Sequence, residues 1–124
     1  MIYMVTPYKK GVRLEYAVRD MLQDLGFWVI RSAGSRGLFD IYGIKDGFVL
    51  GVQCKYSKKI KFATIVDMLK TWQLYHVYPV FVFREDRKTI LYDVVMRCEV
   101  RDIRRIKKYI MQLYDQWKHP YTSP

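Results

Sequence analysis

The sequence predicts an α/β/α sandwich in which helices cover both faces of a central mixed sheet of five strands. Three segments carry apolar residues at the i, i+3, i+4 spacing of amphipathic helices, and short runs rich in β-branched and aromatic residues lie between them. The order is helix, three strands, helix, two strands, helix, which favours helices packed against a sheet. A length of 124 residues suits one compact domain, so we expect a single domain over residues 1–124.

The first half of the chain predicts one helix and three strands. Gly26 is suited to ending the helix. Asp46-Gly47 is typical of a tight hairpin between the second and third strands, because such turns require positive φ. The predicted bounds are 10–25 for the helix and 27–30, 38–44 and 48–56 for the strands.

The second half predicts two helices and two strands. Pro79 opens a continuous apolar run that is typical of a strand covered on both faces. The last helix carries an apolar stripe that ends in Tyr114 and Trp117 and is a candidate two-fold interface. Residues 118–124 contain two prolines and predict a loose tail. The predicted bounds are 62–76 and 100–117 for the helices and 80–83 and 89–95 for the strands.

The charge of the chain favours a polyanionic partner. It carries 22 Lys and Arg against 12 Asp and Glu, a formal net charge of +10. A phosphate backbone rewards such a surface through counterion release, so nucleic acid is the expected partner, with simple solubility as the alternative. No apolar stretch approaches the ~20 residues that span a bilayer, and the basic residues after Pro7 are unlike a signal peptide. We therefore expect no membrane partner and a cytoplasmic, intracellular protein, in the host cytoplasm if the source is viral.

The two cysteines predict free thiols rather than a metal site. Cys54 and Cys98 lie in apolar surroundings, without CxxC spacing and without a nearby histidine. Buried free thiols are the main interpretation, and a disulfide or metal role is the alternative. His76 and His119 lack a partner that would make either of them a catalytic base, so we expect structural roles for both.

Three polar groups interrupt the predicted hairpin and indicate a site. Asp40 lies in one strand, and Gln53 and Lys55 lie two apart on the returning strand, so these two share a face while Cys54 points to the other. A short hairpin brings Asp40 beside Gln53. A carboxylate, an amide oxygen and an ammonium group then converge, which favours Mg²⁺ bound with water and phosphate oxygens. Lys55 would orient a water molecule or stabilise charge on the phosphate.

These residues resemble the PD-(D/E)XK nuclease core, and most closely the archaeal-type Holliday junction resolvase family. Asp40 and the Gln53-Cys54-Lys55 run follow Glu15 on an amphipathic helix, with a Gly34-Ser35 loop between them. The resemblance covers roughly residues 9–95. It implies a restriction-endonuclease-like fold and a Mg²⁺-dependent endonuclease, with Mn²⁺ as a substitute, that cuts four-way DNA junctions as a homodimer without a small-molecule cofactor.

The resemblance also implies a role for each matching residue. Glu15, Asp40, Gln53 and the backbone carbonyl of Cys54 would hold the metal, Lys55 would be the catalytic lysine, and Ser35 would act in catalysis and strand handling. Two positions depart from the family pattern: Phe39 replaces the proline before the aspartate, and Gln53 replaces the motif's acidic residue. The candidate DNA-binding residues are Lys10, Arg13, Arg31, Arg36, Lys58, Lys59 and Lys61.

Other interpretations of these residues stay open. Glu15 is alternatively a solvated helix residue paired with Arg19 at i+4. Ser35 is alternatively a loop residue without a functional role. The basic residues of the last helix either bind further DNA or form a solvated face. At the level of function, the alternatives are another nuclease on the same core, nicking or cutting duplex, and a DNA-binding protein with weak or no catalysis. The amide of Gln53 is the best support for the last of these.

Overall fold

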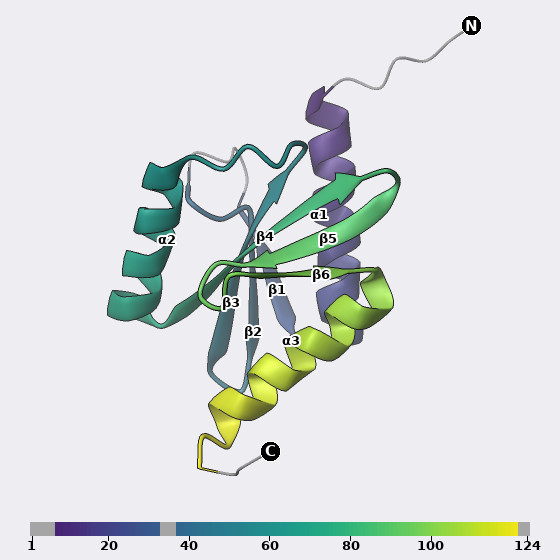
Figure 1. The fold of residues 1–124 in the computed structure, drawn as a ribbon. Coiled ribbons are helices and arrows are strands. Elements are labelled where there is room, and N and C mark those ends of the chain that lie inside the picture. The colour runs from purple at the N-terminus through teal and green to yellow at the C-terminus, as the bar shows by residue number, and fades with distance from the viewer. Residues whose placement is uncertain (1–6, 33–36, 122–124) are drawn as a thin grey trace, which may run out of the picture.

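The computed structural model describes residues 7–32 and 37–121, with side chains from residue 12 onward. The helices are α1 (Pro7–Asp24), α2 (Phe62–Tyr75) and α3 (Ile103–Lys118), and the strands are β1 (Trp28–Arg31), β2 (Ile41–Lys45), β3 (Phe48–Lys55), β4 (Val77–Glu85), β5 (Lys88–Asp93) and β6 (Cys98–Arg101). The strands form one sheet in sequence order. Figure 1 shows α2 on one face of this sheet and α1 and α3 on the other. The predicted sandwich with a mixed sheet is confirmed.

The predicted count of five strands is wrong, because β6 adds a sixth beside β5. The two strands pair antiparallel, with Ile90 opposite Arg101. The sequence prediction started the last helix at residue 100, whereas α3 begins at Ile103. Side chains in β6 alternate between half-buried and exposed. Because β6 lacks the apolar run of the other strands, only its pairing with β5 identifies it.

Strand β4 is longer than the predicted run 80–83 and includes Pro79 in its interior. Six consecutive residues from Tyr78 to Phe83 are buried, which confirms a strand covered on both faces. Pro79 lies opposite Gly51 of β3, and pairing with β5 begins only at Val80. Pro79 therefore has a ladder partner on β3 and none on β5, which suits a residue that lacks an N–H donor.

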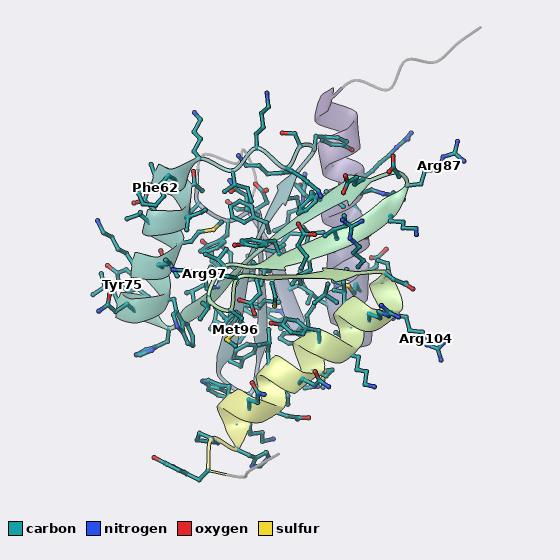
Figure 2. All side chains as sticks on the ribbon, in the orientation of Figure 1. Phe62, Tyr75, Arg87, Met96, Arg97 and Arg104 are labelled. Carbon is teal, nitrogen blue, oxygen red and sulfur yellow. The ribbon has the colours of Figure 1, made fainter. Side chains whose placement is uncertain are left out.

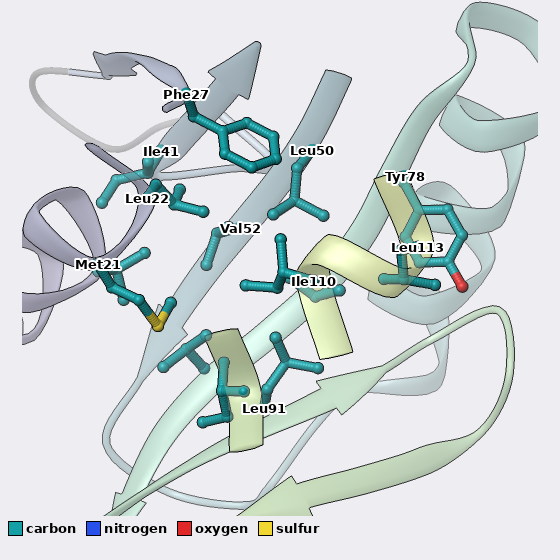
Figure 3. Packing of buried hydrophobic residues seen from close by; sticks show 14 of the residues in the cluster. Met21, Leu22, Phe27, Ile41, Leu50, Val52, Tyr78, Leu91, Ile110 and Leu113 are labelled. Carbon is teal, nitrogen blue, oxygen red and sulfur yellow. The ribbon is translucent and has the colours of Figure 1, made fainter. Parts of the chain in front are cut away.

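The apolar stripe of α3 is buried inside the subunit. Ile106 and Ile110 have no exposed surface, and Tyr114 belongs to the same cluster. In Figure 3, Ile110 lies next to Leu50 of β3 and Leu113 lies beside Tyr78 of β4. The interpretation of this stripe as a two-fold interface is therefore wrong, because the sheet already covers it.

One end of the sheet collects most of the candidate residues, and we call it the Lys55 end. The central pair β3 and β4 is parallel and is joined through α2, as a parallel pair requires. The other strands pair antiparallel, so β1, β3, β4 and β6 finish at this end while β2 and β5 begin there. The residues at this end, in strand order, are Arg31, Ile41, Lys55, Glu85, Lys88 and Arg101.

Asp93 organises a buried polar network at the opposite end. Its side chain has no exposed surface and accepts hydrogen bonds from the hydroxyls of Tyr78, at 2.6 Å, and Tyr109. Its other carboxylate oxygen accepts from the backbone N–H groups of Val95 and Met96, at 2.9 and 3.0 Å. These four donors satisfy a carboxylate that would otherwise be costly to bury.

The remaining predictions on cysteines and membrane segments have simple outcomes. Cys54 and Cys98 are free thiols, as predicted, although both are half-buried rather than fully buried. Among the described residues, every helix is too short or too polar to cross a bilayer.

Candidate active site and metal centre

Glu15 reaches the site from the sheet-facing side of α1. Its neighbours on the helix, Leu14 and Val18, lie in the core, and α1 packs on β1, β2 and β3. This packing leaves the Glu15 residue only 9% exposed. A carboxylate is costly to bury without a partner, so its burial next to the sheet indicates a specific role.

Asp40 lies at an irregularity where β2 begins. Ile41 is the ladder partner of Val52, and the Asp40 N–H also donates to the Val52 carbonyl at 2.9 Å. Two residues thus stand opposite one, which is the pattern of a β-bulge and redirects the side chain. Asp40 Oδ2 accepts a hydrogen bond from the Cys54 N–H at 2.8 Å. The bulge therefore fixes the Asp40 carboxylate against the last residues of β3.

The two carboxylates interact electrostatically. Burial raises the pKa of the Asp40 carboxyl above its ordinary value, and the Glu15 carboxylate raises it further. The Cys54 N–H, the Lys55 ammonium and the Arg31 guanidinium act in the opposite direction and lower that pKa. Asp40 therefore interacts electrostatically with Glu15, Lys55 and Arg31.

The Cys54 side chain takes no part in nucleophilic chemistry here. Burial raises the pKa of its thiol strongly, and the Asp40 and Glu15 carboxylates add to the effect. A neutral thiol is a poor nucleophile and a poor metal ligand. Cys54 is relevant to the site through its backbone N–H, which holds Asp40.

Arg31 is the partner of Glu15. Arg31 Nε donates to Glu15 Oε2 at 2.7 Å, and the guanidinium lies 5.1 Å from the centre of the Tyr16 ring. The alternative pairing of Glu15 with Arg19 is wrong, because Arg19 forms its ion pair with Asp20 at 3.0 Å. The sequence predicted Arg31 as a DNA contact and missed this ion pair, which only the packing of α1 on β1 creates.

Gln53 carries an unsatisfied buried oxygen. Its Oε1 is buried and has no hydrogen-bond partner among the described residues. Gly51, two residues earlier on the same face, faces Phe39 and Val77, whereas Val52 lies in the core on the α1 side. Gln53 and Lys55 continue the face of Gly51 by the strand period of two. An orphaned buried oxygen requires an explanation, and an unoccupied ligand position is one.

The donor set fits a hard divalent cation. Carboxylate oxygens of Glu15 and Asp40, the free amide oxygen of Gln53 and the backbone carbonyl of Cys54 are the oxygen ligands that Mg²⁺ prefers. A cation there would also offset the repulsion that raises the Asp40 pKa. Among the described residues, no group of three or more His, Cys, Asp or Glu side chains could hold a metal ion. The sequence-predicted set has two carboxylates, and its third side-chain ligand would be the amide of Gln53.

The remaining predicted residues divide into three groups. Lys59, Lys61 and Arg13 are exposed and available for a polyanion. Lys58 forms an ion pair with Glu85 at 2.8 Å, so its charge is already compensated. The side chains of Lys10, Ser35 and Arg36 lie outside the described residues.

Comparisons with known proteins agree with this arrangement. A model of the archaeal Holliday junction resolvase (Hjc) family matches residues 6–72, a stretch that includes Glu15, Asp40 and Lys55. The crossover junction endodeoxyribonuclease Hjc of Methanocaldococcus jannaschii is 46% identical over 55 residues, which are 44% of this chain and 41% of that protein. The match thus spans less than half the length of this curated relative.

A solved structure extends the likeness to the fold. Hjc from Archaeoglobus fulgidus, a Holliday junction resolvase of an archaeal hyperthermophile, superposes with a TM-score of 0.57. The superposition covers 74% of this chain and 80% of that one at 21% identity. At this identity the likeness supports the fold alone.

Proposed function

This chain belongs to the archaeal Holliday junction resolvase family, and on that premise we propose that it is a metal-dependent endonuclease that cuts phosphodiester bonds in branched DNA. Four-way junctions are the proposed substrate. The observation that carries the proposal is the meeting of Glu15 and Asp40 beside the Lys55 ammonium at one end of the sheet. Two carboxylates and an ammonium group are the parts that metal-assisted phosphate hydrolysis needs.

The proposed roles follow from the donors at the site. Glu15, Asp40, Gln53 and the Cys54 carbonyl would hold Mg²⁺, or Mn²⁺ in its place. The ion would supply positive charge to the phosphate oxygens and lower the pKa of a bound water. Lys55 places its ammonium where negative charge grows during the reaction. Ser35 keeps the strand-handling role that the family resemblance implies.

Arg31 acts as a positioning residue for Glu15. Its Nε donates to Glu15 Oε2 and its guanidinium lies over the Tyr16 ring, so the side chain is held at two points. A rigid donor of this kind fixes the carboxylate orientation, as outer partners of metal ligands commonly do.

We propose that the enzyme is a homodimer whose contact surface is not the α3 stripe. Leu74 and Tyr75 at the C-terminal end of α2 are large apolar residues that are 65% and 73% exposed, and they are the candidate surface. Figure 2 shows Tyr75 at this end of the helix and Phe62 at the other. The expected result in solution is a mass about twice the 15.0 kDa of one chain by light scattering. A Leu74→Lys, Tyr75→Lys double variant should shift the protein to one-chain mass, and an unchanged mass would exclude this surface.

A DNA-binding protein without efficient catalysis is the second candidate. The specific observation in its favour is Gln53, because an amide oxygen brings no charge to the metal site. We therefore expect Gln53 to raise the Mg²⁺ concentration that cutting requires and to leave DNA binding unaffected.

The test of the proposed function is cleavage of matched DNA substrates in Mg²⁺. We expect the four-way junction to be cut at least tenfold faster than a linear duplex or a single strand of the same sequence, and EDTA to stop the reaction. Wild-type protein that binds the junction without cutting it favours the second candidate. Equal cutting of duplex and junction would indicate another nuclease on the same core.

A further inference from the structure

A cavity at the Lys55 end of the sheet is lined mainly by cationic side chains, which are five of its eight lining residues. It has a volume of about 630 Å³ and lies between the β4–β5 turn, the end of β6 and the start of α3. Its lining residues are Arg84, Arg87, Lys88, Thr89, Arg101, Asp102, Ile103 and Arg105, and we call it the arginine pocket. Figure 2 shows Arg87 at the tip of the β4–β5 turn, on the same side of the molecule as the first turn of α3.

The pocket concentrates positive charge and compensates only part of it. Five lining residues are cationic and one, Asp102, is a carboxylate. Asp102 is already used, because its Oδ1 accepts from the Arg104 N–H to cap α3. Arg101 forms ion pairs with Glu85 and Glu99, each at 3.5 Å. Among the described residues, neither Arg87 nor Arg105 forms an ion pair with a carboxylate, so the pocket favours an anionic ligand.

The arginine pocket lies at the same end of the sheet as the candidate active site. Lys55 is the ladder partner of Phe83 in β4, and Arg84, the next residue of β4, lines the pocket. Strand β6 is three strands from β3, which places Arg101 roughly 14 Å from Lys55 at about 4.8 Å per strand.

That spacing suits the backbone of one DNA strand. Successive phosphates of one strand lie farther apart than the ~3.4 Å rise of each step, because the strand also winds around the axis, so roughly 14 Å corresponds to a few steps along the strand. A phosphate placed at the active site therefore brings phosphates a few steps along the arm to the pocket. Arginine is suited to this contact because its planar guanidinium binds phosphate oxygens in a bidentate manner.

We propose that the arginine pocket binds the phosphodiester backbone of a DNA arm a few nucleotides from the cleaved bond. The identity of the anion as DNA rests on the proposed function. The pocket contributes affinity and orientation of the arm, and it lies apart from the bond that is cut. All of its lining residues follow residue 72, beyond the stretch that the family model matches.

The test removes charge from the pocket without disturbing the backbone. Arg87 has φ 65° in the two-residue turn closed by Glu85 and Lys88, so asparagine, which tolerates this conformation, is the suitable replacement. Glutamine suits Arg105 because it is a good helix former. We expect the Arg87→Asn, Arg105→Gln variant to bind a labelled four-way junction in EDTA about tenfold more weakly than wild type. The slope of log affinity against log salt should fall by about two.

A matched control makes the same chemical changes outside the pocket. Arg97 has φ 56°, and Arg104 lies beside Arg105 on α3 without lining the cavity, so Arg97→Asn, Arg104→Gln removes the same charge from the same backbone settings. Figure 2 shows Arg97 well away from Arg87. The control should keep most of the affinity and of the salt slope.

Replacing single phosphates of the DNA by uncharged methylphosphonates locates the position that the arginine pocket contacts. With methylphosphonates placed one at a time along the arm, a substitution a few nucleotides from the cleaved bond should weaken wild-type binding and leave binding by the pocket variant nearly unchanged. Equal binding by the pocket variant and the control would overturn the proposal, even if wild type still cuts junctions. Stabilisation of wild type alone by inorganic phosphate, with no difference in DNA affinity, would also overturn it. Weaker binding by the pocket variant supports the proposal even if wild type fails to cut.

Discussion

Asp40→Asn should abolish junction cleavage, by on the order of 10³-fold or more, while leaving junction binding within about threefold. The substitution removes the buried carboxylate that would hold the metal. A bound metal stabilises charge in the transition state, which lowers the activation barrier by several kcal/mol. Asparagine keeps an oxygen that can accept the hydrogen bond from the Cys54 N–H. The measurements are single-turnover cleavage in Mg²⁺ and binding in EDTA.

The same variant should fold at least as stably as wild type at neutral pH without metal. Burial and Glu15 raise the pKa of Asp40 in the folded chain, so the folded state binds this proton more tightly than the unfolded state. The stability contributed by Asp40 is thus present below its unfolded pKa and is lost as pH rises through the raised folded pKa. Asparagine does not ionise, so its advantage in urea unfolding should appear at neutral pH and vanish in acid.

An exposed carboxylate provides the control for Asp40→Asn. Asp67 lies on the exposed side of α2, and Asp67→Asn should leave both cleavage and the pH dependence of stability unchanged. Substantial cleavage by Asp40→Asn would contradict the assignment of Asp40 as a metal ligand. Loss of stability together with loss of cleavage would instead indicate a structural role.

Gln53→Glu should lower the Mg²⁺ concentration for half-maximal cleavage by about tenfold or more, because affinity for hard cations rises with the charge of the ligands. The buried, unpaired Oε1 of Gln53 marks the position that the new carboxylate would take. Without metal, a further carboxylate near Asp40 and Glu15 adds repulsion, so the variant should unfold at a lower temperature than wild type. Mg²⁺ should restore that loss by binding only the folded chain.

The control for this change is Gln112→Glu on the exposed side of α3, which should alter neither the metal requirement nor the unfolding temperature. A Gln53→Glu variant with an unchanged Mg²⁺ requirement would show that residue 53 does not contact the ion. In that case the buried, unpaired oxygen of Gln53 needs another explanation, and Glu15 and Asp40 would be the side chains that bind the metal.

The hairpin between β2 and β3 shows which part of the site could be predicted from local sequence patterns. Asp46-Gly47 fixes the register of β2 and β3, since Lys45 pairs with Phe48 across a two-residue turn with positive φ at both positions. That register places the start of β2 against the end of β3, as the sequence indicated. The bulge at Asp40 was not predictable, because its residues carry no signal for an additional residue in the ladder.

The α1 helix shows where local patterns were insufficient. The sequence offered Arg19 as a partner for Glu15 because i+4 neighbours on a helix always lie close. The structure uses Arg31 instead, a residue 16 positions away, because α1 packs on the sheet and turns Glu15 toward β1. Contacts between distant residues depend on how elements dock, and the sequence of one element does not contain that information.

By itself, the sequence determined the α/β class, the helices and five of the six strands, because apolar periodicity and turn residues act over a few positions. It also predicted Asp40, Gln53 and Lys55 as candidate site residues, because polar groups in strand sequence are rare, and the family resemblance added Glu15. The tertiary structure alone decided β6, the network around Asp93, the ion pair of Glu15 with Arg31 and the arginine pocket. Each of these joins residues from separate elements, so its energy exists only once the sheet and helices have assembled.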